Sequence, residues 1–329
     1  MNAAVALTLT AMLLGACAPS IHAPGKAIMQ PLFTDNGFHT ADGAILPLKT
    51  WSPGQGVPKA VLIALHGFND YSNFFAAPGA FLANHSIQSY AYDQRGFGAA
   101  PGPGLWPGMQ ALTDDLEAMI RLIQGRHPGT PLYLLGDSMG GGVILVAGGN
   151  GGLAGVDGVI LTAPAVWGRV TMPWYQRVGL WLGAHLMPSL KLTGEGLGIT
   201  PSDNREMLLA LGRDPLIIKS TRIDAMHGLV NLMDAALDKS ADFTVPALIL
   251  YGQRDEIIPK GPTRMMLARL PTASRGNRRV AVYEDGYHML LRDLKADVVW
   301  RDIAGWIADA AQPLVSGADI NAEHRLAEQ

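Results

Sequence analysis

The sequence predicts an α/β fold in which helices flank a mostly parallel sheet and one helical insertion interrupts the alternation. Short apolar runs recur along the 329 residues and alternate with helical patterns. The runs are apolar at successive positions, as expected for strands covered on both faces. Polar residues with catalytic potential stand directly after several runs, where the carboxyl ends of parallel strands form binding sites.

The apolar runs give the expected strands in chain order. Each run is short and is bounded by glycine, proline or polar residues. The runs span residues 45–51, 59–65, 86–93, 131–135, 158–164, 246–252 and 279–284. The first is expected to form a hairpin that turns at Asp42 and Gly43.

Residues 165–244 predict a helical cap over the strand ends, because no strand pattern occurs there while tryptophan, methionine, proline and glycine cluster. One helical face would carry Trp174, Val178, Trp181, Leu182 and Leu186. This stripe either packs the cap onto the sheet, or lines an acyl-chain site and touches lipid. The expected core comprises residues 35–164 and 245–312, followed by a C-terminal tail at 313–329.

The N-terminus predicts an export signal at residues 1–17 and a tether at residues 18–34. The run from Ala3 to Ala16 has the length of a signal-peptide core and is too short to span a bilayer. It ends in Leu13-Leu14-Gly15-Ala16-Cys17, which resembles the bacterial lipoprotein signal. Cys17, the only cysteine, is therefore the expected lipid-attachment site of an exported, membrane-anchored protein that faces the periplasm or the cell surface.

One feature of this leader departs from the lipoprotein pattern. Its first residues, Met1 and Asn2, carry no positive charge. Secretion into the periplasm or medium after cleavage at Ala16 or Ala18 therefore stays open. Two further alternatives are that the segment stays uncleaved as an anchor, or that the protein is not exported.

Composition limits the partners and cofactors. The chain has 25 basic and 28 acidic residues, a formal charge of −3 and no basic run, which argues against nucleic acid as a partner. Charged residues make up only 16%, which suits a protein that works close to lipid. The sequence implies no metal and no cofactor, because H-E-x-x-H, paired C-x-x-C and phosphate-loop patterns are missing.

Gly136-Asp137-Ser138-Met139-Gly140 has the G-x-S-x-G form of a nucleophile elbow. It follows the expected strand at 131–135, and Gly141 and Gly142 lead into an apolar run that can continue as a helix. In a strand–turn–helix setting, the turn forces the serine into a strained conformation and exposes its hydroxyl. Ser138 is therefore the expected nucleophile.

A serine nucleophile needs a base and a group that orients the base. In this arrangement the acid and then the histidine follow the serine along the chain. Asp255 follows the strand at 246–252, and His288 follows the last strand, so these two residues are the expected partners of Ser138.

The other candidates are less well placed. Glu256 is the nearest rival of Asp255, ahead of Asp157 and Asp285, and Asp137 is expected to support the elbow. Of the nine histidines, only His288 stands at the right place after the last strand, because His324 falls in the expected C-terminal tail. His66 precedes the serine and is expected to shape the loop that holds the oxyanion.

Acyl transfer also needs backbone N–H groups aimed at the developing oxyanion. One is expected from Met139, directly after the nucleophile. The other is expected from the loop after the strand at 59–65, where Phe68 is the best candidate.

Taken together, these segments resemble the α/β-hydrolase family, and within it the monoacylglycerol lipase and lysophospholipase branch, also called serine aminopeptidase S33-like or hydrolase-4. The matching segments, which span roughly residues 35–310, are His66-Gly67-Phe68, Tyr92 to Gly98, Gly136 to Gly141, Tyr251 to Asp255 with Ile258-Pro259, and Gly286-Tyr287-His288. The resemblance implies Ser138, Asp255 and His288 as the triad and a mobile cap over an acyl pocket. Gln94 and Ala99 depart from the more usual histidine and serine, and both could alter the wall of the site.

The expected function is therefore cofactor-independent hydrolysis of carboxylic esters of single-chain lipids, either monoacylglycerols or lysophospholipids, through an acyl-enzyme. The same triad would also fit a small ester, an amide or a peptide. A surface-anchored binding protein that uses the fold without catalysis is a third hypothesis, against which an intact triad argues.

Overall fold

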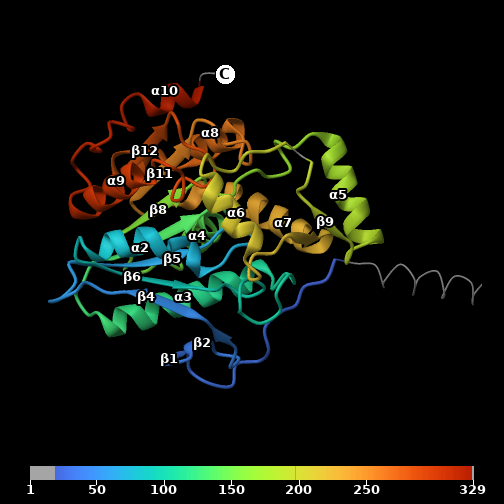
Figure 1. The fold of residues 1–329 in the computed structure, drawn as a ribbon, viewed down its shortest axis with the longest axis horizontal. Coiled ribbons are helices and arrows are strands. Elements are labelled where there is room, and N and C mark those ends of the chain that lie inside the picture. The colour runs from blue at the N-terminus through green and yellow to red at the C-terminus, as the bar shows by residue number, and fades with distance from the viewer. Residues whose placement is uncertain (1–18, 197, 328–329) are drawn as a thin grey trace, which may run out of the picture.

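The computed structural model describes residues 19–196 and 198–327 (Figure 1). The expected leader, with Cys17, lies outside these ranges. Within them, no helix is both long enough and apolar enough to cross a bilayer.

A seven-stranded sheet runs through the molecule and confirms the α/β prediction. Its strands, in spatial order, are β12 (Arg278–Tyr283), β11 (Ala247–Gly252), β8 (Gly158–Thr162), β7 (Leu132–Asp137), β5 (Ala60–Leu65), β6 (Ile87–Tyr92) and β4 (Leu48–Trp51). Every neighbouring pair is parallel except β4 with β6. The carboxyl ends of the parallel strands therefore meet along one edge of the sheet.

Helices cover both faces of this sheet, which explains why the central strands are apolar at successive positions. One apolar layer contains side chains of α2 (Ala76–Ala83) and α9 (Ala296–Ala308). The opposite layer contains side chains of α3 (Met109–Arg126), α4 (Met139–Gly149), α7 (Ile223–Lys239) and α8 (Lys260–Arg269). All six side chains of β5 are buried. Each such leucine or isoleucine stabilises the fold by about 1.5–3 kcal/mol relative to an exposed position.

The expected first strand, residues 45–51, is divided at Pro47. Its start is β3 (Ile45–Leu46), which pairs with β2 (Gly37–His39) in a hairpin around Asp42 and Gly43, and β1 (Leu32–Thr34) completes this small antiparallel sheet. Its end is β4, on the large sheet. Proline interrupts the ladder because it has no N–H to donate.

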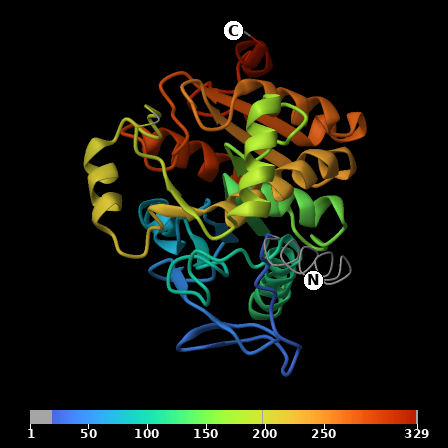
Figure 2. The same ribbon diagram turned by 90° about the vertical axis from the view of Figure 1, so that its right-hand side faces the viewer.

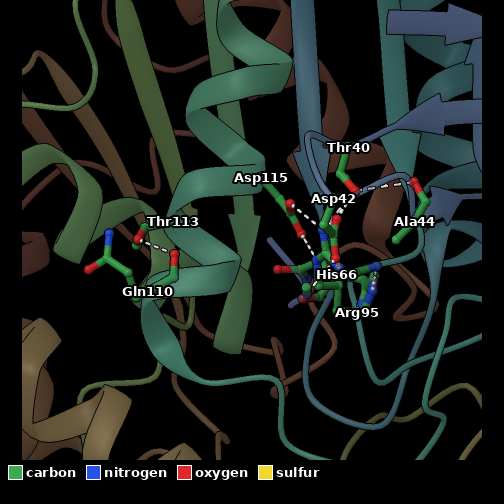
Figure 3. A network of polar contacts seen from close by, with 10 residues as sticks. Thr40, Asp42, Ala44, His66, Arg95, Gln110, Thr113 and Asp115 are labelled. Atoms are coloured by element: carbon green, nitrogen blue, oxygen red, sulfur yellow. Dashed lines mark hydrogen bonds and ion pairs between the residues drawn. The ribbon is translucent and has the colours of Figure 1, made fainter. Parts of the chain in front are cut away.

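A buried arginine ties the small sheet to the rest of the fold (Figure 3). Arg95 bonds to the Asp42 carboxylate at 2.7 Å and to the Asp115 carboxylate at 2.6 Å, and its Nη2 donates to Thr40 at 2.7 Å. The side chains of Arg95, Asp42 and Asp115 are all less than 10% exposed. The guanidinium thus joins the hairpin loop to helix α3.

The described part of residues 165–244 contains three α-helices, one short 3₁₀ helix and a two-stranded ribbon. The helices are α5 (Trp174–Leu186), α6 (Arg205–Arg213) and α7, and the segment ends in the short 3₁₀ helix η2 (Ser240–Asp242). Two antiparallel strands, β9 (Lys191–Thr193) and β10 (Ser220–Arg222), were not expected, because each has only three residues. Helix α7 belongs to the layer of helices on the sheet, since its buried side chains join the same core as those of α4.

The predicted apolar stripe of α5 faces away from the core. Trp174, Val178, Trp181, Leu182 and Leu186 are between 43% and 73% exposed. The helix instead buries Gly183 and Ala184, and Gly183 faces Ile223 at the start of α7. The stripe therefore does not pack this segment onto the sheet.

The C-terminal stretch, expected to be a tail, folds back onto the core. Leu314, Ala318, Ala322 and Leu326 are buried, and the last two belong to α10 (Ala322–Ala327). The Val282 N–H in β12 donates to the Ala318 carbonyl at 2.9 Å. These contacts cover the edge strand of the sheet.

Candidate active site

Ser138 lies in the turn between β7 and α4, with φ of 49° and ψ of −108°. A positive φ is uncommon for a residue with a side chain and marks backbone strain. Three backbone bonds hold this conformation: the Ser138 N–H donates to Thr162 at 2.9 Å, and its carbonyl accepts from Gly142 at 3.1 Å and Ala165 at 2.8 Å. Ser138 is partly exposed, whereas Asp137 and Met139 on either side are buried.

The glycines of the elbow are required by close packing. A Cβ on Gly136 would lie 2.5 Å from the Gly140 carbonyl carbon. A Cβ on Gly140 would lie 2.4 Å from the Leu65 carbonyl oxygen in β5. Both distances are far shorter than a carbon atom tolerates, so β7, α4 and β5 can approach this closely only because these side chains are missing.

His288 and Asp255 form a buried pair at the ends of neighbouring strands. His288 Nδ1 lies 2.8 Å from Asp255 Oδ2, and the two side chains are 7% and 0% exposed. Asp255 Oδ1 accepts from the Ile257 and Ile258 N–H groups at 2.8 and 2.9 Å. Because the ionised carboxylate can only accept, Nδ1 carries the proton and Nε2 is the accepting nitrogen of neutral His288.

The charge around His288 raises the pKa of its imidazole above the usual 6.5. Burial works in the opposite direction and disfavours the imidazolium. The negative charge of Asp255, its hydrogen bond and the charge of Asp137 together outweigh burial. This environment stabilises the cation that forms when the ring accepts a proton.

The structure separates Asp255 from its rivals. Glu256 is exposed and accepts the Thr200 N–H at 2.7 Å. Asp157 accepts from Leu132 at the opposite end of β7, and Asp285 forms exposed ion pairs with basic side chains. Asp137 accepts the Thr162 hydroxyl at 2.6 Å, directly beside the elbow, and burial raises the pKa of its carboxyl.

His66 is buried and fixed by the loops that surround it. Its Nε2 accepts the Gln94 N–H at 2.9 Å, so Nδ1 must carry the proton that is donated to the Gly67 carbonyl at 2.8 Å. The Gln94 side chain donates to the His66 carbonyl at 2.9 Å. Burial lowers the pKa of His66, which keeps the ring neutral. Both nitrogens are occupied, and the ring orients the loop that leads to Phe68.

The two predicted oxyanion donors flank the serine. Met139 is the first residue of α4, where a helix leaves its N–H groups without intrahelical acceptors. Phe68 follows Gly67, and a Cβ on Gly67 would lie 3.4 Å from Ser138 Cβ. Neither N–H donates to an acceptor among the described residues.

Two charged residues just after His288 were missed in the sequence. Arg292 forms a partly buried ion pair with Asp70, in the loop after Phe68. Asp293 accepts the Tyr287 N–H at 2.8 Å. Their proximity to His288 in the sequence, four and five residues after it, could have marked them as candidates. Asp70 and Ser202, with which they interact, are too far away in the sequence for a local pattern to show the contacts.

Comparisons with known proteins identify the family. Residues 56–295 match the family described as serine aminopeptidase, S33. A monoacylglycerol lipase from Mycolicibacterium smegmatis is 24% identical over 83% of this chain and 96% of its own length. The human monoglyceride lipase is 26% identical over 82% of this chain and 88% of its own length.

Solved structures share the fold. A soluble variant of monoglyceride lipase from Saccharomyces cerevisiae superposes with a TM-score of 0.69 at 21% identity, over 88% of this chain and 97% of that one. A monoacylglycerol lipase from Paleococcus ferrophilus gives 0.67 at 19% identity, over 81% and 99%. The chain belongs to the serine aminopeptidase S33 family of α/β-hydrolases, and it is a monoglyceride lipase-like carboxylic ester hydrolase.

Proposed function

We propose that the protein is a serine hydrolase in which Ser138 is the nucleophile, His288 the general base and Asp255 the residue that orients His288. The observation that carries this proposal is the buried His288–Asp255 hydrogen bond of 2.8 Å at the same sheet edge as the strained Ser138. The bond fixes the tautomer in which Nε2 can accept a proton, as a serine triad requires.

The reaction follows from these roles. Ser138 Oγ attacks the ester carbonyl carbon while His288 Nε2 takes the hydroxyl proton, and the Phe68 and Met139 N–H groups bind the resulting oxyanion. Collapse expels the alcohol, which receives the proton from His288. Water then attacks the acyl-enzyme, again with His288 as base, and the free acid leaves as Ser138 regains its proton.

Single-chain lipids, monoacylglycerols first and lysophospholipids second, are the proposed substrates. The relatives described as monoacylglycerol and monoglyceride lipases support this choice. The exposed stripe of α5 supports it as well, because contiguous apolar side chains on a surface mark an interaction site. Trp174, Tyr175 and Trp181, with exposures of 55% to 73%, suit the boundary between water and lipid.

Membrane anchoring through Cys17 is part of the same proposal. Figures 1 and 2 show the first described residues beside one end of α5. An anchor that continues from this point would bring the stripe of α5 to the bilayer surface. The lipid chains of a modified Cys17 would supply the affinity that one acyl chain alone lacks.

Ester hydrolysis by the wild type and by Ser138→Ala tests the proposal. We expect the wild type to prefer long-chain monoacylglycerol over acetyl and butyryl esters, and the variant to lose at least about 10³-fold in kcat. A fluorophosphonate probe should label the wild type only. Activity that survives in Ser138→Ala would exclude the serine mechanism. A chain-length profile that peaks at acetyl or butyryl esters would instead favour the small-ester alternative.

A further inference from the structure

A buried carboxylate outside the proposed triad holds the residue that precedes His288. The Tyr287 N–H donates to Asp293 Oδ2 at 2.8 Å, and the Ser202 hydroxyl donates to Asp293 Oδ1 at 2.6 Å. Asp293 is 7% exposed and Ser202 is 2% exposed. One side chain thus connects the loop of His288 to the segment at 165–244.

Ser202 belongs to a stretch, residues 200–204, that we call the clasp. The clasp makes four further hydrogen bonds to the loops that carry His288 and Asp255. They run from Met289 N to Pro201 O (3.0 Å), from Asn204 Nδ2 to Arg292 O (3.0 Å), from Leu294 N to Asp203 Oδ1 (2.8 Å), and from Thr200 N to a Glu256 carboxylate oxygen (2.7 Å). The clasp is therefore bonded to both the His288 loop and the Asp255 loop. Among the bonds named here, the one between Ser202 and Asp293 is the only one that joins two buried side chains.

The buried environment of Asp293 makes its carboxylate depend on both of its hydrogen bonds. Burial raises the pKa of this carboxyl to about 6, while the bonds from Ser202 and the Tyr287 N–H act in the opposite direction. Asp203 and Asp137 are the nearby charges that add to the effect of burial. A buried donor or acceptor that loses its partner is costly, so the loop conformation depends on both donors.

We propose that Asp293 is a positioning residue for His288, and that through Ser202 it transmits the position of the clasp to the base. It acts by fixing the backbone at Tyr287 rather than by touching substrate. The inference rests on the proposed function, in which His288 takes the proton from Ser138. A small misplacement of a base lowers the rate of the chemical step far more than it weakens binding.

Three variants test this proposal on a soluble short-chain ester. Asp293→Ala removes both bonds, and we expect kcat to fall by about 10- to 100-fold with KM changed less than about twofold. Ser202→Ala removes the clasp bond alone and should lower kcat by about 3- to 10-fold. Asp293→Asn can still accept from Tyr287 and donate to the Ser202 hydroxyl, so it should stay within about threefold of the wild type.

Asp302 and Ser316 provide a matched control pair. Asp302 is 1% exposed and accepts the Ser316 N–H at 3.0 Å and the Ser316 hydroxyl. It also accepts the Tyr283 hydroxyl at 2.8 Å, so Ser316→Ala is the closer match, to Ser202→Ala. Like Asp293, it holds a backbone N–H and a serine hydroxyl, but in α9 and the C-terminal stretch. Asp302→Ala and Ser316→Ala should lower the melting temperature while kcat per folded molecule stays unchanged.

The outcomes separate this inference from the proposed function. Each rate is divided by the fraction of protein that a fluorophosphonate labels at Ser138. All measurements are made well below the melting temperature of each variant. If the wild type is not labelled, the proposed function fails. If it is labelled and active but Ser202→Ala and Asp293→Ala keep its kcat, as the controls do, the positioning role is wrong. If Asp293→Ala does not fold, the kcat of Ser202→Ala decides whether Asp293 has the positioning role. Equal losses in Asp293→Asn and Asp293→Ala would overturn the hydrogen-bond account.

Discussion

Ser138 carries backbone strain at the centre of the site. Its φ of 49° and ψ of −108° lie outside the regions that residues with side chains prefer, at an expense of about 1–3 kcal/mol. Three backbone bonds and the packing of Gly136 and Gly140 against neighbouring strands hold it there. The neighbouring Met139 N–H has no intrahelical acceptor because α4 begins at that residue, and this leaves it available for the proposed oxyanion contact.

The His288–Asp255 pair predicts the pH dependence of the reaction. His288 must be neutral to accept a proton, and its pKa is raised, so kcat/KM should fall as the pH drops through a value above 6.5. Asp255→Asn removes the charge and leaves burial to act, so the acid limb should move to lower pH while kcat falls by about 10⁴-fold. Rate profiles of both proteins check this. An acid limb at the same pH in both would contradict the assignment of Asp255.

The same pair links pH to stability. Because the folded-state pKa of His288 is raised, its stabilising contribution is complete below pH 6.5 and is lost as the pH rises through the folded value. Among the described residues, Asp293 and Asp115 shift in the raised direction too, each to about 6. These three groups therefore all make folding more favourable toward mildly acidic pH, whereas the proposed catalysis requires the opposite.

At the scale of elements, the small sheet depends on Arg95. Arg95→Met leaves the carboxylates of Asp42 and Asp115 in a buried site without their cation, so we expect a loss of about 3–5 kcal/mol in the free energy of unfolding. The loss should be smaller near pH 5, because protonation relieves the unpaired carboxylates. Urea unfolding at both pH values measures it.

Arg121→Met is the control for that prediction. Arg121 is 66% exposed and lies 3.8 Å from Glu117, one turn away on the same helix, α3. Its removal should change stability by less than about 0.5 kcal/mol. A loss in Arg95→Met no larger than this would show that the buried network does not hold the small sheet.

At the scale of the whole molecule, the lipoprotein hypothesis is testable from the leader. We expect the full-length protein, expressed in a bacterium, to partition with membranes, and Cys17→Ser to release it into the soluble fraction. Mass measurement of the mature N-terminus gives an independent answer. An unmodified Cys17 or Pro19 at the N-terminus would favour plain secretion instead.

The large sheet could be predicted from the sequence because burial on both faces leaves uninterrupted apolar runs, as in β5. Ser138, Asp255 and His288 could be nominated because each directly follows such a run. Other features depend on contacts that no local pattern records. Ser202 and Asp293 are 91 residues apart, β9 and β10 are three residues each, and the C-terminal stretch folds through widely spaced apolar residues.

Helix α5 buries only Gly183 and Ala184 of its thirteen residues. Two such small residues bury little apolar surface, so we expect the helix to open as a separate unit at a free energy far below that of global unfolding. Its amide protons should exchange with deuterium through this local opening, well before those of β5 or β7. The surface proposed to meet lipid is thus expected to lie on a part of the molecule that can rearrange while the sheet, and the residues at its edge, stay in place.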